Sequence, residues 1–147
     1  MNLRNFEDDY KSIEHIYPQK VVEECWRSSF AQYSVKERNV LKHSIGNLVP
    51  LSKPKNSSLG NKCFDVKKGG TGKKTGYAYG CYSEIEVSQH TNWTAREILT
   101  RGIQLLEFME RRWGFDLGSK QDKIKALALQ FVAAQELKEE SKGSASQ

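Results

Sequence analysis

The sequence predicts an α+β domain in which two short strands are set among several helices. Residues 10–17 mix β-branched and aromatic types in loose alternation before a proline, which predicts a strand that ends near His15. Residues 47–51 form a compact apolar run that contains a proline, which is typical of a short edge strand. A capping box at residues 94–97 opens a long amphipathic helix.

The elements between the two strands, and directly after them, follow from spacing and capping signals. Apolar residues three to five positions apart predict a helix over residues 20–33. Ser34 and Glu37 form a capping box for a second helix, which Gly46 closes. A short helix is predicted over residues 54–64, where a proline suits the first turn.

The second half of the chain is predicted to begin with a long loop. This loop covers residues 66–92 and includes a hairpin at residues 77–87. The long helix then runs to about Trp113, and a last helix is capped near Ser119. The tryptophans are expected in the core: Trp26, Trp93 and Trp113.

The length of 147 residues fits one domain with an appendage. We assign residues 1–118 to the main domain and residues 119–138 to a C-terminal helix packed on it. Residues 139–147 are polar and are expected to form a disordered tail.

Composition favours a soluble globular protein. Hydrophobic residues make up 37% of the chain and charged residues 28%, and no run approaches the length of a membrane span. No N-terminal apolar run resembles a secretion signal, so we expect a cytoplasmic protein without membrane contact. Cys25, Cys63 and Cys81 are scattered, which predicts buried or idle thiols rather than a zinc ribbon or a disulfide framework.

Positive charge is concentrated in one segment. The net charge is +5, yet residues 53–74 alone contain seven lysines and one aspartate. A lysine-rich stretch on a nearly neutral body is typical of a surface that faces a polyanion, and a solvated loop is the simpler alternative. The glycines in this stretch lack Walker A spacing, which excludes a P-loop NTPase.

Glu14 and His15 lie side by side at the end of the first predicted strand. A neutral histidine is a good general base near pH 7, and carboxylate and amide oxygens suit Mg²⁺. Neighbouring strand residues point to opposite faces, but a strand end before a proline twists, so both side chains can reach one site. A lone Glu-His pair is nevertheless more often a surface pair.

Three segments, taken in order, resemble the motif of HNH (His-Me finger, ββα-metal) endonucleases. Residues 13–19, I-E-H-I-Y-P-Q, are similar to the opening [D/E/H]-H-I-x-P-Q. Residues 47–51 resemble the second strand with its leading Asn, and Asn56 falls where the final His or Asn of the motif lies. Further residues resemble the C-terminal HNH domain of GmrSD-type modification-dependent restriction proteins: Asn61, Phe64, Lys67, Trp93, Ile98 and Arg101.

The resemblance implies a ββα-metal core with additional packed helices, and it implies a role for each motif residue. His15 would be the general base, while Glu14 and Asn56 would bind one Mg²⁺ or Mn²⁺ ion. Asn47 would brace the loop and help to orient His15, and Asn61 is a fallback ligand. The usual residues are Asp at position 14 and His at position 56, and the Asn favours Mg²⁺ or Mn²⁺ over Zn²⁺.

The resemblance also implies a metal-dependent endonuclease that nicks or cleaves DNA in a bacterial anti-phage or restriction system. An N-terminal sensor or NTP-using domain, or a partner subunit, is expected outside this chain. Two alternatives remain open, a non-catalytic module that binds nucleic acid or a partner protein, and an RNA-cleaving toxin with the same site. The expected phosphate contacts are Lys55, Lys62, Lys67, Lys68, Lys73 and Lys74.

Overall fold

The computed structural model describes residues 12–51, 53–69 and 75–145 of the chain. Within these residues, a small antiparallel sheet is formed by β1 (Ser12–His15) and β2 (Leu48–Leu51). The register pairs Glu14 with Val49 and His15 with Leu48. The predicted α+β class, with strands at these two places, is confirmed.

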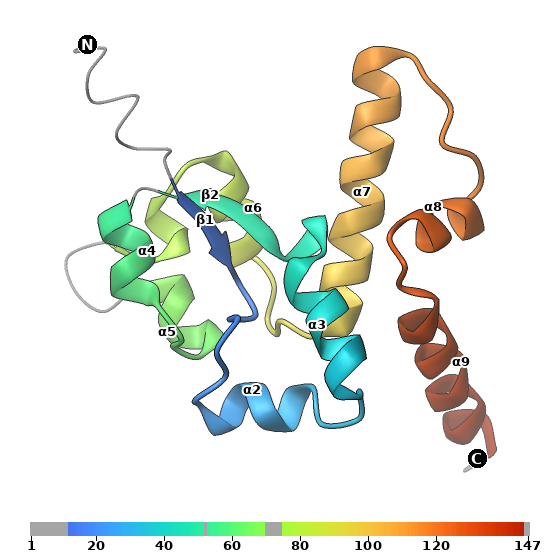
Figure 1. Cartoon of the computed structure of the whole chain (residues 1–147), viewed down its shortest axis with the longest axis horizontal. Helices are drawn as coiled ribbons and strands as arrows, with labels where there is room; N and C mark the ends of the chain where they lie inside the picture. The colour runs from blue at the N-terminus through green and yellow to red at the C-terminus, as the bar shows by residue number, and fades with distance from the viewer. Residues whose placement is uncertain (1–11, 52, 70–74, 146–147) are drawn as a thin grey trace.

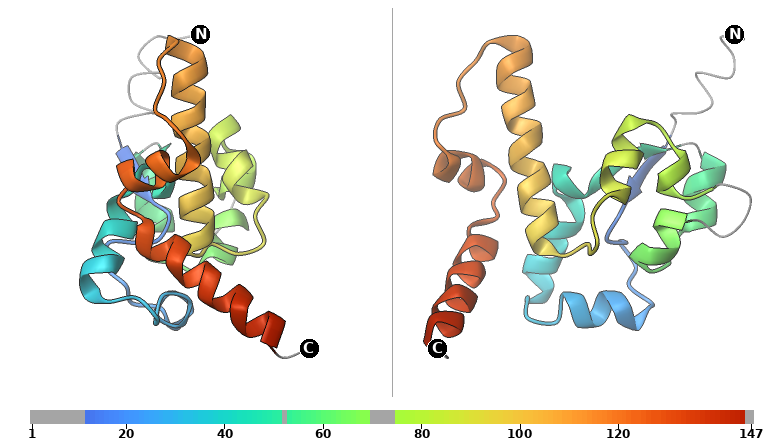
Figure 2. Two further views of the ribbon diagram at one scale, coloured as in Figure 1. Left: turned by 90° about the vertical axis from the view of Figure 1, so that its right-hand side faces the viewer. Right: turned by 180° about the vertical axis from the view of Figure 1, so that it is seen from behind.

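Helices surround this strand pair on several sides. Figure 1 shows α4 and α5 on one side of the strands and α7 on the other, with α8 and α9 beyond α7. Seen from behind in Figure 2, α6 lies in front of the strands. The helices and 3-10 turns are α2 (Glu24–Ser29), α3 (Val35–His43), η1 (Ile45–Asn47), α4 (Lys53–Leu59), α5 (Phe64–Gly69), η2 (Tyr77–Tyr79), α6 (Tyr82–Ser88), α7 (Ala95–Trp113), α8 (Lys120–Ala126) and α9 (Gln130–Ala145).

Aromatic side chains fill much of the core next to the strands. The Tyr17 ring stacks on Phe30 with centroids 3.8 Å apart and lies 5.7 Å from the Trp26 ring. Burying each large side chain of this kind contributes roughly 1.5–3 kcal/mol. Trp26 and Trp93 are buried as predicted, but Trp113 is 61% exposed because α7 extends past the core at its C-terminal end.

Both predicted capping boxes are confirmed. The Ser34 amide donates to the Glu37 carboxylate at 2.9 Å, and the Glu37 amide donates to the Ser34 hydroxyl at 3.2 Å. At the start of α7, the Thr94 amide donates to the Glu97 carboxylate at 2.8 Å. Gly114 ends α7 with a left-handed φ of 68°, the conformation that glycine adopts most readily at helix ends.

The 3-10 turn η1 fastens the start of β2 to α7. A Cβ atom at Gly46 would lie 2.0 Å from the carbonyl oxygen of Ile98, so this close approach requires glycine. Arg101 on α7 donates to the carbonyl oxygens of Gly46 and Leu48 at 3.0 and 2.8 Å. Because Leu48 pairs with His15, α7 also fixes the strand end that carries the histidine.

The hairpin predicted over residues 77–87 is wrong, since this segment forms η2 and α6. The Cys81 amide donates to the Glu84 carboxylate at 2.9 Å, which caps the first turn of α6. Glu84 and Val87 are both buried, and their spacing of three residues places them on one helical face. The loop predicted from residue 66 also contains most of α5.

Other helices differ from the prediction in extent. Helix α2 is shorter than the predicted 20–33, and the helix predicted over residues 54–64 is α4. The predicted last helix is divided into α8 and α9, because Ala128 between them adopts a φ of 57°. Helix α9 reaches Ala145, over residues that we expected to be disordered. None of the described helices combines the length and apolarity needed to cross a lipid bilayer.

A disulfide bond joins Cys25 on α2 to Cys63 just before α5, whereas Cys81 is a free thiol. This pairing corrects the prediction of three buried or idle thiols. The two cysteines are brought together by the packing of α2 against the α4–α5 connection, where Trp26 Nε1 donates to the carbonyl oxygen of Lys62 at 2.9 Å. Scattered cysteine spacing carries no signal of such a contact.

Candidate active site

Asn47 fastens the segment that follows β1. Its side chain is fully buried, its Oδ1 accepts from the Tyr17 amide at 2.8 Å and from Trp93 Nε1 at 3.1 Å, and its Nδ2 donates to the Tyr17 carbonyl oxygen at 2.9 Å. Its own carbonyl oxygen accepts from the Ile16 amide at 3.0 Å. These bonds hold the backbone directly after His15, so Asn47 acts on that residue through the main chain.

His15 lies beside a pocket of about 210 Å³ at the end of β1. The side-chain nitrogen of Gln19 lies 3.1 Å from its ring nitrogens, and the His43 ring stands edge-on with a centroid separation of 5.3 Å. Burial, followed by the positive charges of His43 and Lys67, lowers the pKa of His15 below its ordinary value of 6.5. The ring is therefore mainly neutral at pH 7 and able to accept a proton.

Asn56 and Asn61 line the same pocket as His15. Asn56 lies on α4, and its Nδ2 donates to the Ser12 hydroxyl and, at 3.3 Å, to the carbonyl oxygen of Ile13. These bonds tie α4 to β1. The structure therefore brings the predicted base together with the predicted helix ligand and with the fallback ligand.

The side chain of Glu14 is buried, although the residue borders this pocket. It is 1% exposed, and its Oε1 accepts from Lys67 Nζ at 2.5 Å and from the Tyr77 hydroxyl at 3.1 Å. Burial raises the pKa of the Glu14 carboxyl, and the Lys67 ammonium opposes that rise. Burial also lowers the pKa of Lys67, which is fully enclosed.

The predicted ligands differ in how well they fit a metal ion. One Glu14 oxygen, Oε1, already faces an ammonium nitrogen at 2.5 Å in a buried setting, so Oε1 does not fit a divalent cation in its present arrangement. Asn56 and Asn61 line the open pocket and offer neutral amide oxygens; because Mg²⁺ is usually held by carboxylates together with substrate phosphates, these two residues would need the phosphate to complete a site. Among the described residues, no three His, Cys, Asp or Glu side chains are grouped to hold a metal ion.

The sequence profile of a family described as GmrSD restriction endonucleases, C-terminal domain, matches residues 2–108. The chain belongs to this family. The match covers both strands, the helices from α2 to α6 and most of α7, and it ends before α8 and α9. The resemblance to the C-terminal domain of GmrSD-type restriction proteins is thereby confirmed. No curated protein and no solved structure matches the chain.

Two of the lysines expected to contact phosphate are used inside this GmrSD C-terminal domain. Lys67 has no exposed surface, which contradicts a role in binding a phosphate group at the surface. Lys55 pairs with the buried Glu84 at 2.5 Å, and 16% of the lysine side chain is exposed. Both lysines neutralise carboxylates that the fold encloses.

The other predicted phosphate contacts lie nearer to solvent or outside the described residues. Lys62 Nζ donates to the carbonyl oxygen of Ser58 at 2.8 Å. The Lys68 side chain is 25% exposed, and its Nζ donates to the carbonyl oxygen of His90 at 3.2 Å and lies 3.8 Å from Asp65 Oδ1. Lys73 and Lys74 lie outside the residues that the structure describes.

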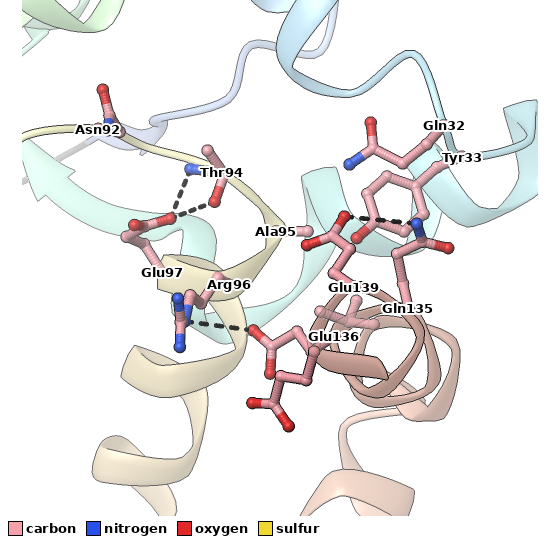
Figure 3. Close-up of a pocket in the computed structure, with 12 residues that line it drawn as sticks. Gln32, Tyr33, Asn92, Thr94, Ala95, Arg96, Glu97, Gln135, Glu136 and Glu139 are labelled. Carbon is pink, nitrogen blue, oxygen red and sulfur yellow. Dashed lines mark hydrogen bonds and ion pairs between the residues drawn. The ribbon is translucent and has the colours of Figure 1, made fainter. Parts of the chain in front are cut away.

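A second pocket, of about 460 Å³, lies between the start of α7, the turn before α3, and α9 (Figure 3). Its lining includes the carboxylates of Glu97, Glu136, Glu139 and Glu140, and Arg96 pairs with Glu136 at 3.5 Å. The acidic residues of α9 follow the part of the chain that matches the GmrSD C-terminal domain. A wall rich in carboxylates repels phosphate, so this pocket does not suit a nucleic-acid strand.

Three residues that surround the His15–Glu14 pair in the structure were not predicted to belong to the site. Gln19 belongs to the opening motif of the family but received no role, so its place in the motif was the available signal. His43 was assigned to a structural helix, and Tyr77 to a loop. Folding alone brings these two residues to the strand end, and no local pattern indicates it.

Proposed function

We propose that this domain is a metal-dependent endonuclease of the HNH type that nicks or cleaves DNA. The observation that carries the proposal is the placement of His15 and Asn56 at one open pocket, and the lowered pKa of His15 supports it. In this assignment β1, β2 and α4 form the ββα-metal unit, since an antiparallel pair is followed directly by a helix. Membership of a family described as restriction endonucleases supports the same function.

Each residue around the pocket has a proposed task. His15 would take a proton from the attacking water at a ring nitrogen, and Gln19 would restrain the ring. Asn47 keeps the backbone after His15 in place. Asn56, with Asn61 nearby, would hold Mg²⁺ or Mn²⁺. A bound cation would supply charge stabilisation at the phosphate and at the leaving 3′ oxygen. Attack of water at phosphorus with cleavage of the P–O3′ bond would leave a 5′ phosphate and a 3′ hydroxyl.

The proposed substrate is DNA, and the proposed setting is a bacterial anti-phage or restriction system. Both follow from the family description rather than from a base-reading surface. Contacts to phosphate position a strand without reading its sequence. We therefore expect a sensor or NTP-using domain, or a partner subunit outside this chain, to select the DNA.

A non-catalytic nucleic-acid-binding module is the second candidate, and the Glu14–Lys67 pair favours it. This pair engages the carboxylate that the motif assigns to metal binding. A module of that kind binds nucleic acid equally well in EDTA, with an affinity that falls steeply with salt.

The two candidates are separated by incubating supercoiled plasmid with the protein in Mg²⁺, Mn²⁺ or EDTA, with labelled RNA in parallel. We expect nicked or linear DNA with either metal and intact plasmid in EDTA. The new ends should require phosphatase treatment before a kinase can label them. Binding without cleavage in every metal would favour the binding module, and cleavage of RNA alone would favour an RNase toxin.

A further inference from the structure

Lys67 on α5 is a lysine with no exposed surface. Its Nζ donates to Glu14 Oε1 at 2.5 Å, to the carbonyl oxygen of His15 at 3.1 Å, and to that of Ile16 at 2.9 Å. An ammonium group has three N–H donors, and these three acceptors use all of them. The acceptors belong to three consecutive residues at the end of β1.

Tyr77 in η2 completes this network. Its hydroxyl donates to Glu14 Oε1 at 3.1 Å, and its ring is fully buried. Burial, and then the Glu14 charge, raise the pKa of Tyr77 well above its ordinary value, so the phenol keeps its proton and remains a donor. Two elements, α5 and η2, are therefore attached to the strand end that carries the proposed base.

A buried ion pair is not required for stability, because well-packed hydrophobic residues of similar volume often serve equally well. Here the ammonium group bonds the backbone of the proposed base itself, and small displacements of a reacting group are costly. We propose that Lys67 is a positioning residue that holds His15 in its working orientation, with Glu14 as its counter-charge rather than a metal ligand. This inference rests on the proposed nuclease function.

The contacts of Glu14 oppose metal binding at Oε1. A divalent cation bound at Oε1 would meet the Lys67 ammonium, whose nitrogen is 2.5 Å from this oxygen. Displacing that ammonium would break its bonds to the His15 and Ile16 carbonyl oxygens as well. The metal ligands are then expected on the α4 side of the pocket, where Asn56 and Asn61 lie.

Lys67→Met tests the positioning role, with Lys123→Met as the matched control. Lys123 on α8 is also buried and pairs with the partly exposed Glu110 at 2.9 Å, so each substitution removes the ion pair of a buried lysine. We expect both variants to melt at lower temperature than wild type. Where all three proteins are folded, Lys67→Met should lower kcat on DNA by about 10²-fold with KM changed less than about threefold, whereas Lys123→Met should keep the wild-type kcat.

Glu14→Gln separates a counter-charge from a metal ligand. Under the proposal this variant lowers kcat, but the Mg²⁺ concentration that gives half-maximal rate stays within about twofold of the wild-type value. A rise of about tenfold or more in that concentration would show that Glu14 binds the metal, and would overturn this part of the proposal.

Amide hydrogen exchange in the metal-free protein gives a readout that does not depend on cleavage. The Ile16 and Tyr17 amides both donate to Asn47. We expect them to exchange at least about tenfold faster in Lys67→Met, and at the wild-type rate in Lys123→Met. Unchanged exchange in Lys67→Met would overturn the positioning role. If exchange is faster in Lys67→Met but the wild-type protein cleaves no DNA, the proposed function is overturned. The role of Lys67 in holding the backbone after β1 would then still be supported.

Discussion

The surroundings of His15 favour the neutral form of its ring. Burial penalises the imidazolium first, and the positive charges of His43 and Lys67 penalise it further. All three effects lower the pKa, so they act in the direction that a general base requires at pH 7. The Gln19 amide then restrains the ring from the exposed side of the molecule.

We predict that kcat/KM falls at acid pH with an apparent pKa below 6.5, because protonation of His15 removes the proton acceptor. His43→Gln removes one positive neighbour, so the acid limb of this variant should move upward, towards 6.5. Initial rates of wild type and of His43→Gln between about pH 4.5 and pH 8 measure the acid limb of each pH–rate profile. A wild-type limb centred above 6.5 would contradict the proposed state of the ring.

Part of the candidate site could be predicted from the sequence, because two motif residues lie at or beside the ends of short strands that local patterns reveal. His15 ends β1, and Asn47 holds the segment that follows, as expected. The burial of Glu14 could not be predicted, since its partners Lys67 and Tyr77 come from segments that were assigned to a loop. The side chains of Glu14 and His15 point to opposite faces of β1, as strand alternation dictates, and the expected twist of the strand end does not overcome this.

At the level of elements, capping boxes and long periodic segments were predicted well, whereas short segments were not. Helix α7 carries both signals and begins and ends where expected. Helix α6 has seven residues with two buried positions, too few to distinguish a helical period from strand alternation. The pairing of Cys25 with Cys63 depends on how α2 packs, which spacing does not reveal.

We predict that the Cys25→Ser/Cys63→Ser double variant is less stable than wild type by about 4 kcal/mol, the chain-entropy value for a loop of this length. The cysteines are 38 residues apart, and the Cys63 carbonyl oxygen accepts from the Lys67 amide, so the bond also anchors α5. Urea unfolding measures the difference. Cys81→Ser is the control and should unfold at the wild-type midpoint, because Cys81 is a free thiol. Equal midpoints for the double variant and wild type would contradict this role.

At the scale of the whole molecule, the fold gives different partners to several of the lysines that are clustered in residues 53–74 of the sequence. Lys55 and Lys67 neutralise the enclosed carboxylates of Glu84 and Glu14, and Lys62 bonds a carbonyl oxygen. The acidic pocket beside α9 lies on different elements. The lysine-rich segment therefore offers less free charge to a polyanion than its composition suggests.

We predict that replacing Lys68, Lys73 and Lys74 by glutamine weakens DNA binding and flattens its salt dependence. For each lysine that binds a phosphate, its replacement should reduce the slope of log K against log salt concentration by about 0.9. Fluorescence anisotropy in EDTA measures binding without cleavage. The control replaces three exposed lysines on other elements by glutamine, with no expected change in slope: Lys36, Lys125 and Lys138. Equal slopes for the two triple variants would show that the segment does not bind phosphate.

The central claim is that His15 is the base of a metal-dependent nuclease, and comparing His15→Ala with His43→Ala on supercoiled plasmid in Mg²⁺ tests it most directly. His43 is the matched control because its ring lies 5.3 Å from His15 on exposed α3 surface. Both variants should keep the wild-type circular dichroism spectrum. His15→Ala should lower cleavage by about 10²–10⁴-fold, and His43→Ala by less than about tenfold. Cleavage near the wild-type rate by folded His15→Ala would contradict the claim.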